Sequence, residues 1–592
     1  MLANHKSIDL SLFYERLLGH IEARTNNSTS QMMFYGGTGI MIKKIIRMSA
    51  LGLGLLVSSP NFAAELADQI LFNGKVITVN DQFQIVQAIA IKGERILKVG
   101  SNTDIKKLRG PDTKMMDLHR KTVIPGLIDN HAHFVRAPEH DELRLDNVTS
   151  RKQAIAMIRE RVKQSHPGEW IITIGGWSSD QFMDDARGFP LTELDQIAPN
   201  NPVVIQEVYW RSFLNSAALK ELRLTESTPD PRGGKILKGS DGKLTGVIDG
   251  AGGVAFIAAK LPLPNPAEWR SNVLKVVTEI NSMGITAWYD AGGRGMTDKH
   301  YLPYEQLANE QKLNARVFWS TIRQPMTIPE VDTVVAEIAQ QKPFQGGDYF
   351  SNIGWGETTY APFTTSLTRN DFQVRSEDLE QVRRITDALA ERGLMLNNHV
   401  EMSNAIDALL DEYEALNKRR PIKGYRWVFS HLDQVTLQEL RRMQKLGMYA
   451  GLHSRPLIQG GLMHQVHGEG AWDMPPFRRV QDSGIIWGLG SDATAVTTSN
   501  PFYSLYFATT GRMINGKKVN HQNITREEAL IAHTRSNAYF LFQEDNLGSI
   551  QAGKYADILV LDHDYLTVSA EKIKDIKPVA TMVGGKFVFQ AQ

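Results

Sequence analysis

The chain has no cysteine among its 592 residues. This excludes a disulfide framework, thiolate metal ligands and a cysteine nucleophile, so any metal ion has to be bound by His, Asp, Glu or a modified Lys. An excess of charge is also lacking, because 66 Lys and Arg balance 65 Asp and Glu to a formal charge of +1. No global field therefore favours nucleic acid or an anionic membrane. We expect a local site, a small-molecule substrate and no nucleic-acid partner.

The apolar run 48–57 near the start of the chain is too short to span a bilayer permanently. It follows a basic stretch and precedes small residues at 63–64, which is the order found in secretory signals. An ordinary buried helix is the alternative. We predict an upstream extension at 1–40, a signal peptide at 41–64 that starts at Met41, and a periplasmic or secreted mature protein without a stable membrane anchor.

Short β-type runs dominate both ends of the remaining chain. Residues 67–123 contain several such runs separated by Asn-Gly, Lys-Gly and Gly-Ser turns. The stretches ADILVLD and ATMVGGKFVFQ near the C-terminus have the same texture. We therefore predict one β-sandwich domain built from both chain ends, residues 65–123 and 543–592.

The middle of the chain, 124–542, alternates short apolar runs with helical patterns. This alternation indicates parallel strands covered by helices, and its length favours a closed barrel over an open sheet. Turn-rich segments interrupt the rhythm between about 150 and 263, where we predict an insertion near the barrel mouth, with a lid as one interpretation. The predicted fold class is α/β: a distorted (β/α)8 TIM-like barrel plus the terminal β-sandwich.

The clearest local signal is VIPGLIDNHAHF, an apolar strand that ends in His131 and His133. Residues i and i+2 of a strand point to the same face, so both imidazoles can reach one ion. Three more apolar strand candidates end in His399, His431 and Asp492. In a barrel the C-terminal strand ends meet at one mouth, so we expect the five side chains to lie together. Taken singly, each has a structural alternative, a rim histidine or a helix N-cap.

These motifs, with GLGSDATAV and LGSIQAGKYADILVLDHDYL, resemble the amidohydrolase superfamily, specifically its amidohydrolase family 3 branch. The resemblance implies that His131 and His133 bind a buried metal, that His399 and His431 complete the site, and that Asp492 is a ligand and the general base. We assign catalytic roles to Asp492 and His431. Imidazole and carboxylate ligands in a reaction without redox change favour Zn2+ (zinc), as one or two divalent ions.

The resemblance implies hydrolysis of a C–N bond in a small molecule, not a peptide bond of a protein, with a metal-activated water as nucleophile. A carboxylate beside such a water can take its proton and pass it to the leaving nitrogen. Two alternatives stay open: a hydrolytic deaminase of an aminated heterocycle, and an inactive periplasmic binding protein. A homodimer is also left open.

The chain departs from its relatives at two places. Where many carry a carboxylated lysine on the fourth strand, it has GWGETTY with Glu357. A glutamate there can bridge two ions, bind substrate or cap the next segment; we include it among the metal ligands. Where the branch often has Asp-Gly-His, this chain has Tyr209, Trp210 and Arg211. We predict that Trp210 and Arg211 bind substrate, since an arginine beside aromatics can grip a carboxylate or stack on a planar ligand; a structural pair on the insertion is the alternative.

Further candidates follow other strands. His453 ends YAGLH and is predicted to face substrate, with a rim histidine as the alternative. We predict that His464, His467 and Trp472 lie on a Gly-rich, mobile loop that contacts substrate, and we assign no second metal site to the two histidines because no helical pattern surrounds them. Asp290 ends GITAWYD and is best explained as a helix cap.

Overall fold

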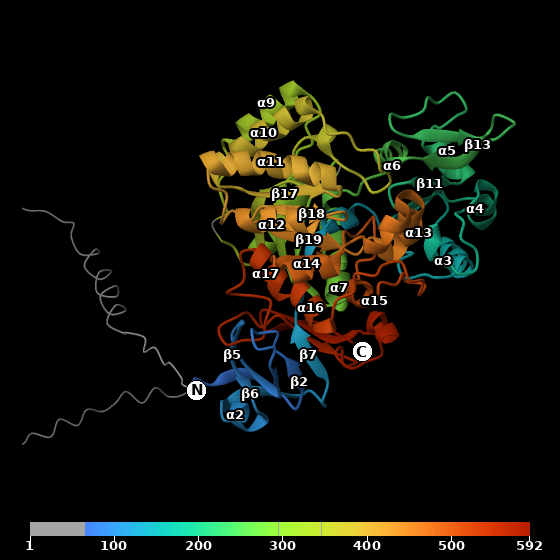
Figure 1. The fold of residues 1–592 in the computed structure, drawn as a ribbon. Coiled ribbons are helices and arrows are strands. Elements are labelled where there is room, and N and C mark those ends of the chain that lie inside the picture. The colour runs from blue at the N-terminus through green and yellow to red at the C-terminus, as the bar shows by residue number, and fades with distance from the viewer. Residues whose placement is uncertain (1–64, 294, 345, 592) are drawn as a thin grey trace, which may run out of the picture. The chain divides into compact units, whose positions relative to one another are not determined.

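The computed structural model describes residues 65–591 except 294 and 345. The predicted extension at 1–40 and the signal peptide at 41–64 lie outside the described residues. Within these residues three sheet regions are present: a barrel, a pair of sheets from the chain ends, and a sheet in the insertion (Figure 1). No helix of the described part is long and apolar enough to cross a membrane.

The barrel is an eight-stranded parallel sheet whose order is β20-β19-β18-β17-β16-β15-β14-β8. The strands are β8 (Leu127–Ala132), β14 (Ile285–Asp290), β15 (Arg316–Thr321), β16 (Phe350–Trp355), β17 (Met395–Val400), β18 (Val428–His431), β19 (Tyr449–His453) and β20 (Trp487–Gly490). Hydrogen bonds join its first and last segments: Asp492 N donates to His131 O at 2.8 Å, and Ser491 Oγ to Asp129 Oδ2 at 2.6 Å. The nearly closed barrel confirms the predicted fold class.

Helices follow the barrel strands and pack beside one another outside the sheet (Figure 1). They are α7 (Pro266–Ser282), α8 (Leu302–Asn309), α9 (Ile328–Ile338), α10 (Ser376–Arg392), α11 (Ser403–Arg419), α12 (Leu437–Leu446), α13 (Pro456–His467), α14 (Phe477–Ser483), α15 (Pro501–Thr510), α16 (Arg526–Ala532) and α17 (Arg535–Phe540). Their ends follow from the sequence: at α12, Thr436 and Glu439 form a capping box, and Gly447 ends the helix with φ 71°.

The barrel interior is apolar below its mouth. One layer contains side chains from seven strands and from α17, namely Ile128, Ala287, Phe318, Ile353, Met395, Val428, Tyr449 and Phe540. Bulky side chains of this kind make the inside of such a barrel a packed core rather than a pore. His131, His399 and His431 lie near the C-terminal ends of β8, β17 and β18, beyond this apolar layer.

The chain ends build two small sheets. A four-stranded sheet has the order β5-β4-β1-β6, and a six-stranded sheet the order β23-β22-β21-β7-β2-β3. Their strands are β1 (Ala67–Phe72), β2 (Lys75–Ile77), β3 (Ile85–Val86), β4 (Ala88–Lys92), β5 (Arg95–Gly100), β6 (Arg109–Asp117), β7 (Thr122–Pro125), β21 (Ile558–Leu561), β22 (Pro578–Val583) and β23 (Lys586–Gln590). Because β7 pairs with β21, with Ile124 opposite Leu559, both chain ends form one structure.

The insertion folds as an α/β layer of its own (teal to green in Figure 1). Its sheet has the order β12-β13-β11-β10-β9, and apolar side chains of α3 and α4 cover one face while those of α5 and α6 cover the other. The elements are α3 (Arg151–Gln164), β9 (Ile171–Ile174), α4 (Leu191–Ile197), β10 (Val203–Glu207), β11 (Arg211–Leu214), α5 (Ser216–Glu221), β12 (Lys235–Lys238), β13 (Leu244–Asp249) and α6 (Ala251–Ala258). It approaches the barrel mouth where Gly176 N donates to Ala495 O at 2.8 Å.

Candidate metal centre

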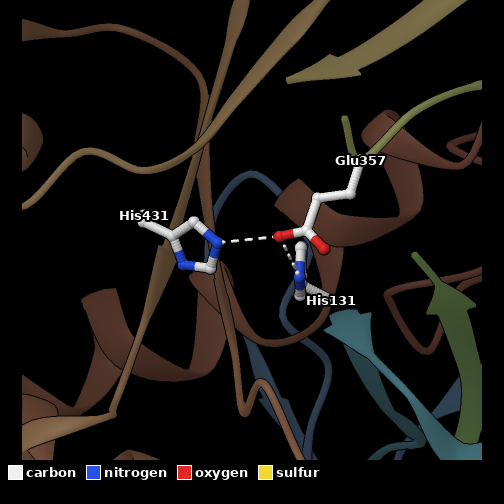
Figure 2. A group of neighbouring side chains, drawn as sticks. All are labelled: His131, Glu357 and His431. Carbon is white, nitrogen blue, oxygen red and sulfur yellow. Dashed lines mark hydrogen bonds and ion pairs between the residues drawn. The ribbon is translucent and has the colours of Figure 1, made fainter. Parts of the chain in front are cut away.

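Glu357, directly after β16, is the carboxylate around which three imidazoles gather. Its Oε1 lies 2.7 Å from His399 Nδ1, 3.0 Å from His431 Nε2 and 3.4 Å from His131 Nε2. Figure 2 shows His131 and His431 approaching this oxygen from two different directions. Three barrel strands thus direct their polar ends at one point.

Asp492 forms a second group with the histidines of the first strand. Its Oδ1 lies 3.1 Å from His133 Nε2 and 3.8 Å from His131 Nε2, and its Oδ2 lies 3.8 Å from His431 Nδ1. His131 is close to both carboxylates, so the two groups adjoin. The structure therefore brings together all six predicted ligands, which are His131, His133, Glu357, His399, His431 and Asp492.

The donor set fits a divalent metal ion. Both ring nitrogens of His131 are buried and lack a hydrogen-bond partner among the described residues. An unsatisfied buried polar group costs about 1–3 kcal/mol. A cation that accepts a lone pair from the imidazole removes that cost, and imidazole nitrogen with carboxylate oxygen is the usual ligand set of zinc outside thiolate sites. This orphaned imidazole is the signature expected of a metal ligand.

The charges of the centre suit a cation as well. Burial opposes ionisation of Glu357, yet the adjacent His131, His399 and His431 hold its pKa well below the usual range. Burial, then the charge of Arg455, lowers the pKa of His431 well below its usual value. His431 is therefore neutral, which is the form that binds metals, and Glu357 is anionic.

Backbone contacts orient His133. Its Nδ1 hydrogen-bonds to the carbonyl of Gly292, which turns Nε2 toward Asp492. Such an outer contact fixes the tautomer and ring position of a ligating histidine. Asp290 supports the same segment, because it accepts hydrogen bonds from Val135 N at 2.9 Å and from Tyr301 Oη at 2.8 Å. Its role is that of a cap on the turn after His133, in line with the structural explanation favoured from sequence.

His453, predicted to face substrate, lies inside the centre. Its Nδ1 is 2.8 Å from His431 Nδ1, and its ring centroid is 4.4 Å from that of His131. His431, His453 and Asp492 form a third group of potential ligand atoms. The position excludes a rim histidine and makes His453 a neighbour of the metal ligands.

Next to the histidines lies a group of three charged residues, here called the charged ring, that the sequence analysis did not predict. Glu401, Asp433 and Arg455 each stand two residues after a histidine of the centre, His399, His431 and His453. Arg455 donates from Nη1 to Glu401 at 2.8 Å and from Nη2 to Asp433 at 2.8 Å, and its Nε is 3.8 Å from Asp492. The repeated His-x-charged pattern at strand ends is the signal that would have identified this ring.

The residues predicted on the insertion do not join the centre as a group. Arg211 is exposed and pairs with Asp249 at 3.1 Å, which favours the structural alternative over substrate binding. Trp210 is half-buried against the largest apolar cluster. Burial lowers the pKa of His133, but Asp492 and, to a smaller extent, Tyr209 raise it well above its usual value.

The prediction of a mobile loop around His464, His467 and Trp472 is wrong. Residues 456–467 form α13, and a 3-10 helix, η5 (Gly468–Asp473), follows. His464 hydrogen-bonds to the Val519 carbonyl at 3.0 Å, His467 to that of Leu367 at 2.8 Å, and Trp472 stacks on a histidine. The glycines misled the prediction: the helix forms because its apolar face is buried in the core.

Comparison with known proteins agrees with this geometry. A family model described as the amidohydrolase family matches residues 114–589, so the chain belongs to this family. N-substituted formamide deformylase of Arthrobacter pascens is 26% identical over 553 residues, which cover 88% of this chain and 98% of that protein. Protein LONG AFTER FAR-RED 3 of Arabidopsis thaliana is 26% identical over 556 residues, 89% of this chain and 92% of that one.

An uncharacterized metal-dependent hydrolase from Pyrococcus horikoshii has a similar solved structure, with a TM-score of 0.61 at 19% identity; the match covers 85% of this chain and 99% of that one. It shows the same fold. The family match confirms the resemblance seen in the sequence and the predicted enzyme class, a metal-dependent amidohydrolase.

Proposed function

We propose that this protein hydrolyses a C–N bond, other than a peptide bond of a protein, in a small molecule, with one or two zinc ions. One observation supports this most: the buried His131, whose ring nitrogens make no hydrogen bond to any described residue, lies between the carboxylates of Glu357 and Asp492. The A. pascens relative, which is matched over 98% of its length, carries the name of an enzyme that acts on N-substituted formamides. A bond between an acyl group and nitrogen is therefore the favoured target.

A divalent ion at such a centre supplies an acidified water and polarises the bond to be cleaved. His131, His133, His399 and His431 would hold it, with Asp492 and with Glu357 in place of a carboxylated lysine. Because Glu357 Oε1 faces His399 and His431 while Asp492 Oδ1 faces His133, the two carboxylates divide the ligands into two groups. This division would suit either one divalent ion or two.

Asp492 is the proposed base. Its carboxylate is 5% exposed and is held between His133 on one side and Arg455 on the other. It accepts the proton of the attacking water and donates it to the leaving nitrogen, so that the departing amine is neutral. His431 hydrogen-bonds through Nε2 to the second carboxylate, Glu357, and through Nδ1 to His453.

The decisive experiment compares Asp492→Asn with wild type on four compound classes: N-formyl, N-acyl, cyclic-amide and aminated-ring compounds. We expect acid release from an N-formyl or N-acyl compound and a fall of about 10³-fold or more in kcat for the variant, a loss typical of removing a group that acts in the transition state. Metal content is measured in parallel, and Asp482→Asn, an exposed carboxylate on α14, is the control.

Three results would contradict the proposal. Turnover by Asp492→Asn equal to that of wild type would contradict the assignment of Asp492 as the base. Activity that survives complete removal of metal by a chelator would contradict the proposal that the reaction needs a metal ion. Release of ammonia from aminated rings, without acid release from amides, would replace it by the deaminase alternative.

A further inference from the structure

The side chain of His453 makes one hydrogen bond among the described residues, and its partner is a proposed metal ligand. His453 ends β19 and is 2% exposed. Its Nδ1 lies 2.8 Å from Nδ1 of His431, whereas its Nε2 is buried and makes no hydrogen bond to any described residue. Two imidazole nitrogens at this distance share one proton, so one ring donates and the other accepts. The direction of this hydrogen bond depends on what the other nitrogen of His431 does.

That other nitrogen, His431 Nε2, faces the carboxylate around which three imidazoles gather. It lies 3.0 Å from Glu357 Oε1 (Figure 2). On the Nδ1 side the carboxylate is farther away, since Asp492 Oδ2 lies 3.8 Å from His431 Nδ1. Although His431, His453 and Asp492 form a group of potential ligand atoms, the closer carboxylate and the imidazoles beside it favour Nε2 as the nitrogen of His431 that would hold a divalent ion.

The positions of the protons follow from this assignment. A neutral imidazole carries one proton, on one of its two nitrogens. When Nε2 of His431 gives its lone pair to an ion, the proton of that ring is on Nδ1 and is donated to His453 Nδ1. His453 then carries its own proton on Nε2, so it has no lone pair left for an ion. Without an ion, His431 donates from Nε2 to Glu357, and His453 becomes the donor of the shared proton. An imidazole can serve His431 in both states, which a carbonyl or an ionised carboxylate cannot, because each only accepts.

The residues that follow His453 hold it in place. Ser454 Oγ lies 2.8 Å from Ser504 Oγ of α15, and Arg455 donates to Glu401 at 2.8 Å. The strand itself pairs with the neighbouring β18 in the barrel sheet. His453 is therefore presented by a rigid strand end, as is needed of a residue that fixes the orientation of another imidazole.

We propose that His453 is a positioning residue of the metal centre: it accepts the Nδ1 proton of His431, keeps Nε2 of that ring directed at the ion, and does not bind the ion itself. This inference rests on the proposed function in one respect, the presence of a divalent ion at the centre. Outer contacts to a ligating histidine typically contribute about 10- to 100-fold to metal affinity or activity. His453 would then act on the reaction through His431, in place of the contact with substrate predicted from its position in the sequence.

The test measures Zn2+ affinity in single variants, by competition between the metal-stripped protein and a chelator. His453→Leu leaves the Nδ1 proton of His431 without an acceptor and should weaken binding by about 10- to 100-fold. His453→Asn should restore most of the affinity, because its amide oxygen is as many bonds from the backbone as Nδ1 and can accept the same proton. His453→Gln, which carries the same amide one methylene farther out, should restore less. The control is His467→Asn, whose parent histidine on α13 hydrogen-bonds to the Leu367 carbonyl, and it should bind Zn2+ like wild type.

Co2+ loading distinguishes a positioning residue from a ligand. The visible spectrum of the Co2+ protein and the number of ions bound at saturation should be the same in wild type and His453→Asn. A lower stoichiometry or a changed spectrum in this variant would make His453 a ligand and overturn the proposal. Equal Zn2+ affinity in wild type and His453→Leu, or equal losses in His453→Leu and His453→Asn, would overturn it as well. Should His453→Leu fail to fold, the comparison of His453→Asn with His453→Gln decides, and equal affinities contradict the proposal.

Metal binding separates this inference from the proposed function, because none of these measurements needs turnover. Weaker Zn2+ binding in His453→Leu that is restored in His453→Asn supports the positioning role even if no compound is hydrolysed. Hydrolysis by wild type, together with equal Zn2+ binding in wild type and every His453 variant, refutes the positioning role alone. A wild-type protein that binds no divalent ion overturns both.

Discussion

Replacement of Arg455 by methionine tests how the charged ring behind the histidines is balanced. The substitution removes the only donor, among the described residues, that reaches Glu401 and Asp433 together, each at 2.8 Å. Both carboxylates are almost completely buried, at 1% and 3% exposure. Breaking a buried ion pair by removing one partner costs about 3–5 kcal/mol, because the other charge stays buried and uncompensated.

The expected shift in melting temperature follows from the size of the folded unit, Ala64–Gln592. At about 2.1 cal/mol/K per residue, the entropy of unfolding of this unit is roughly 1.1 kcal/mol/K. A loss of about 3–5 kcal/mol in the free energy of unfolding therefore lowers Tm by about 3–5 °C. Calorimetry of the metal-loaded protein measures this shift in Tm. Arg211→Met, which breaks an exposed pair, should shift Tm by less than about 1 °C.

A second substitution distinguishes charge from packing. In Arg455→Met/Asp433→Asn the carboxylate of Asp433 is neutralised, while Glu401 keeps His399 at 3.5 Å, so we expect part of the lost stability to return. Burial, opposed by Arg455, already raises the pKa of Asp433 to about 7, which shows that its charge depends on the arginine. The reasoning is refuted if Arg455→Met melts like Arg211→Met, or if the double variant is less stable than the single one.

Three further predictions concern stability. Gly488→Ala places a methyl group 1.8 Å from Tyr449 Oη inside the barrel and should cost about 1–3 kcal/mol, seen as a lower Tm; an unchanged Tm would contradict the packing described. Burial, then Arg136, lowers the pKa of His140 to about 4 from 6.5, so the unfolded chain binds this proton first and stability falls as pH drops from about 6.5 toward 4. Between pH 7 and 5 the loss is at most about 2 kcal/mol, and denaturant titrations of His140→Gln should show a flatter pH dependence than wild type. Thr436→Ala removes the cap of α12 and should cost about 1 kcal/mol, whereas Thr436→Ser should cost less; equal losses would argue against the cap.

The sequence was sufficient to predict the barrel and the clustering of the six proposed ligands, because both depend on local order. Each barrel strand is a short apolar run, and its last residues reach the mouth whatever the details of packing. His131 and Asp492 were therefore placed from strand ends alone. Arg455 was not, because its role depends on which residues of two neighbouring strands turn toward it, and that is set only when the strands are side by side.

In the insertion and in α13, the sequence did not predict the structure correctly. Glycine-rich stretches suggested turns and a loop, but burial against a neighbouring surface stabilised regular structure there. Likewise, the sequence alone could not decide whether Arg211 binds substrate or forms a structural ion pair. The folded chain shows that it pairs with Asp249.

The contact between the first barrel strand, β8, and the last, β20, determines when during synthesis the proposed set of metal ligands can be complete. His131 and Asp492 are 361 positions apart in the chain, yet a backbone hydrogen bond of 2.8 Å joins them. A nascent polypeptide shorter than 492 residues has no complete set of ligands, however well its earlier strands have folded. The proposed ligands can therefore bind a divalent metal ion as a complete set only after the last strand of the barrel has been synthesised and lies beside the first.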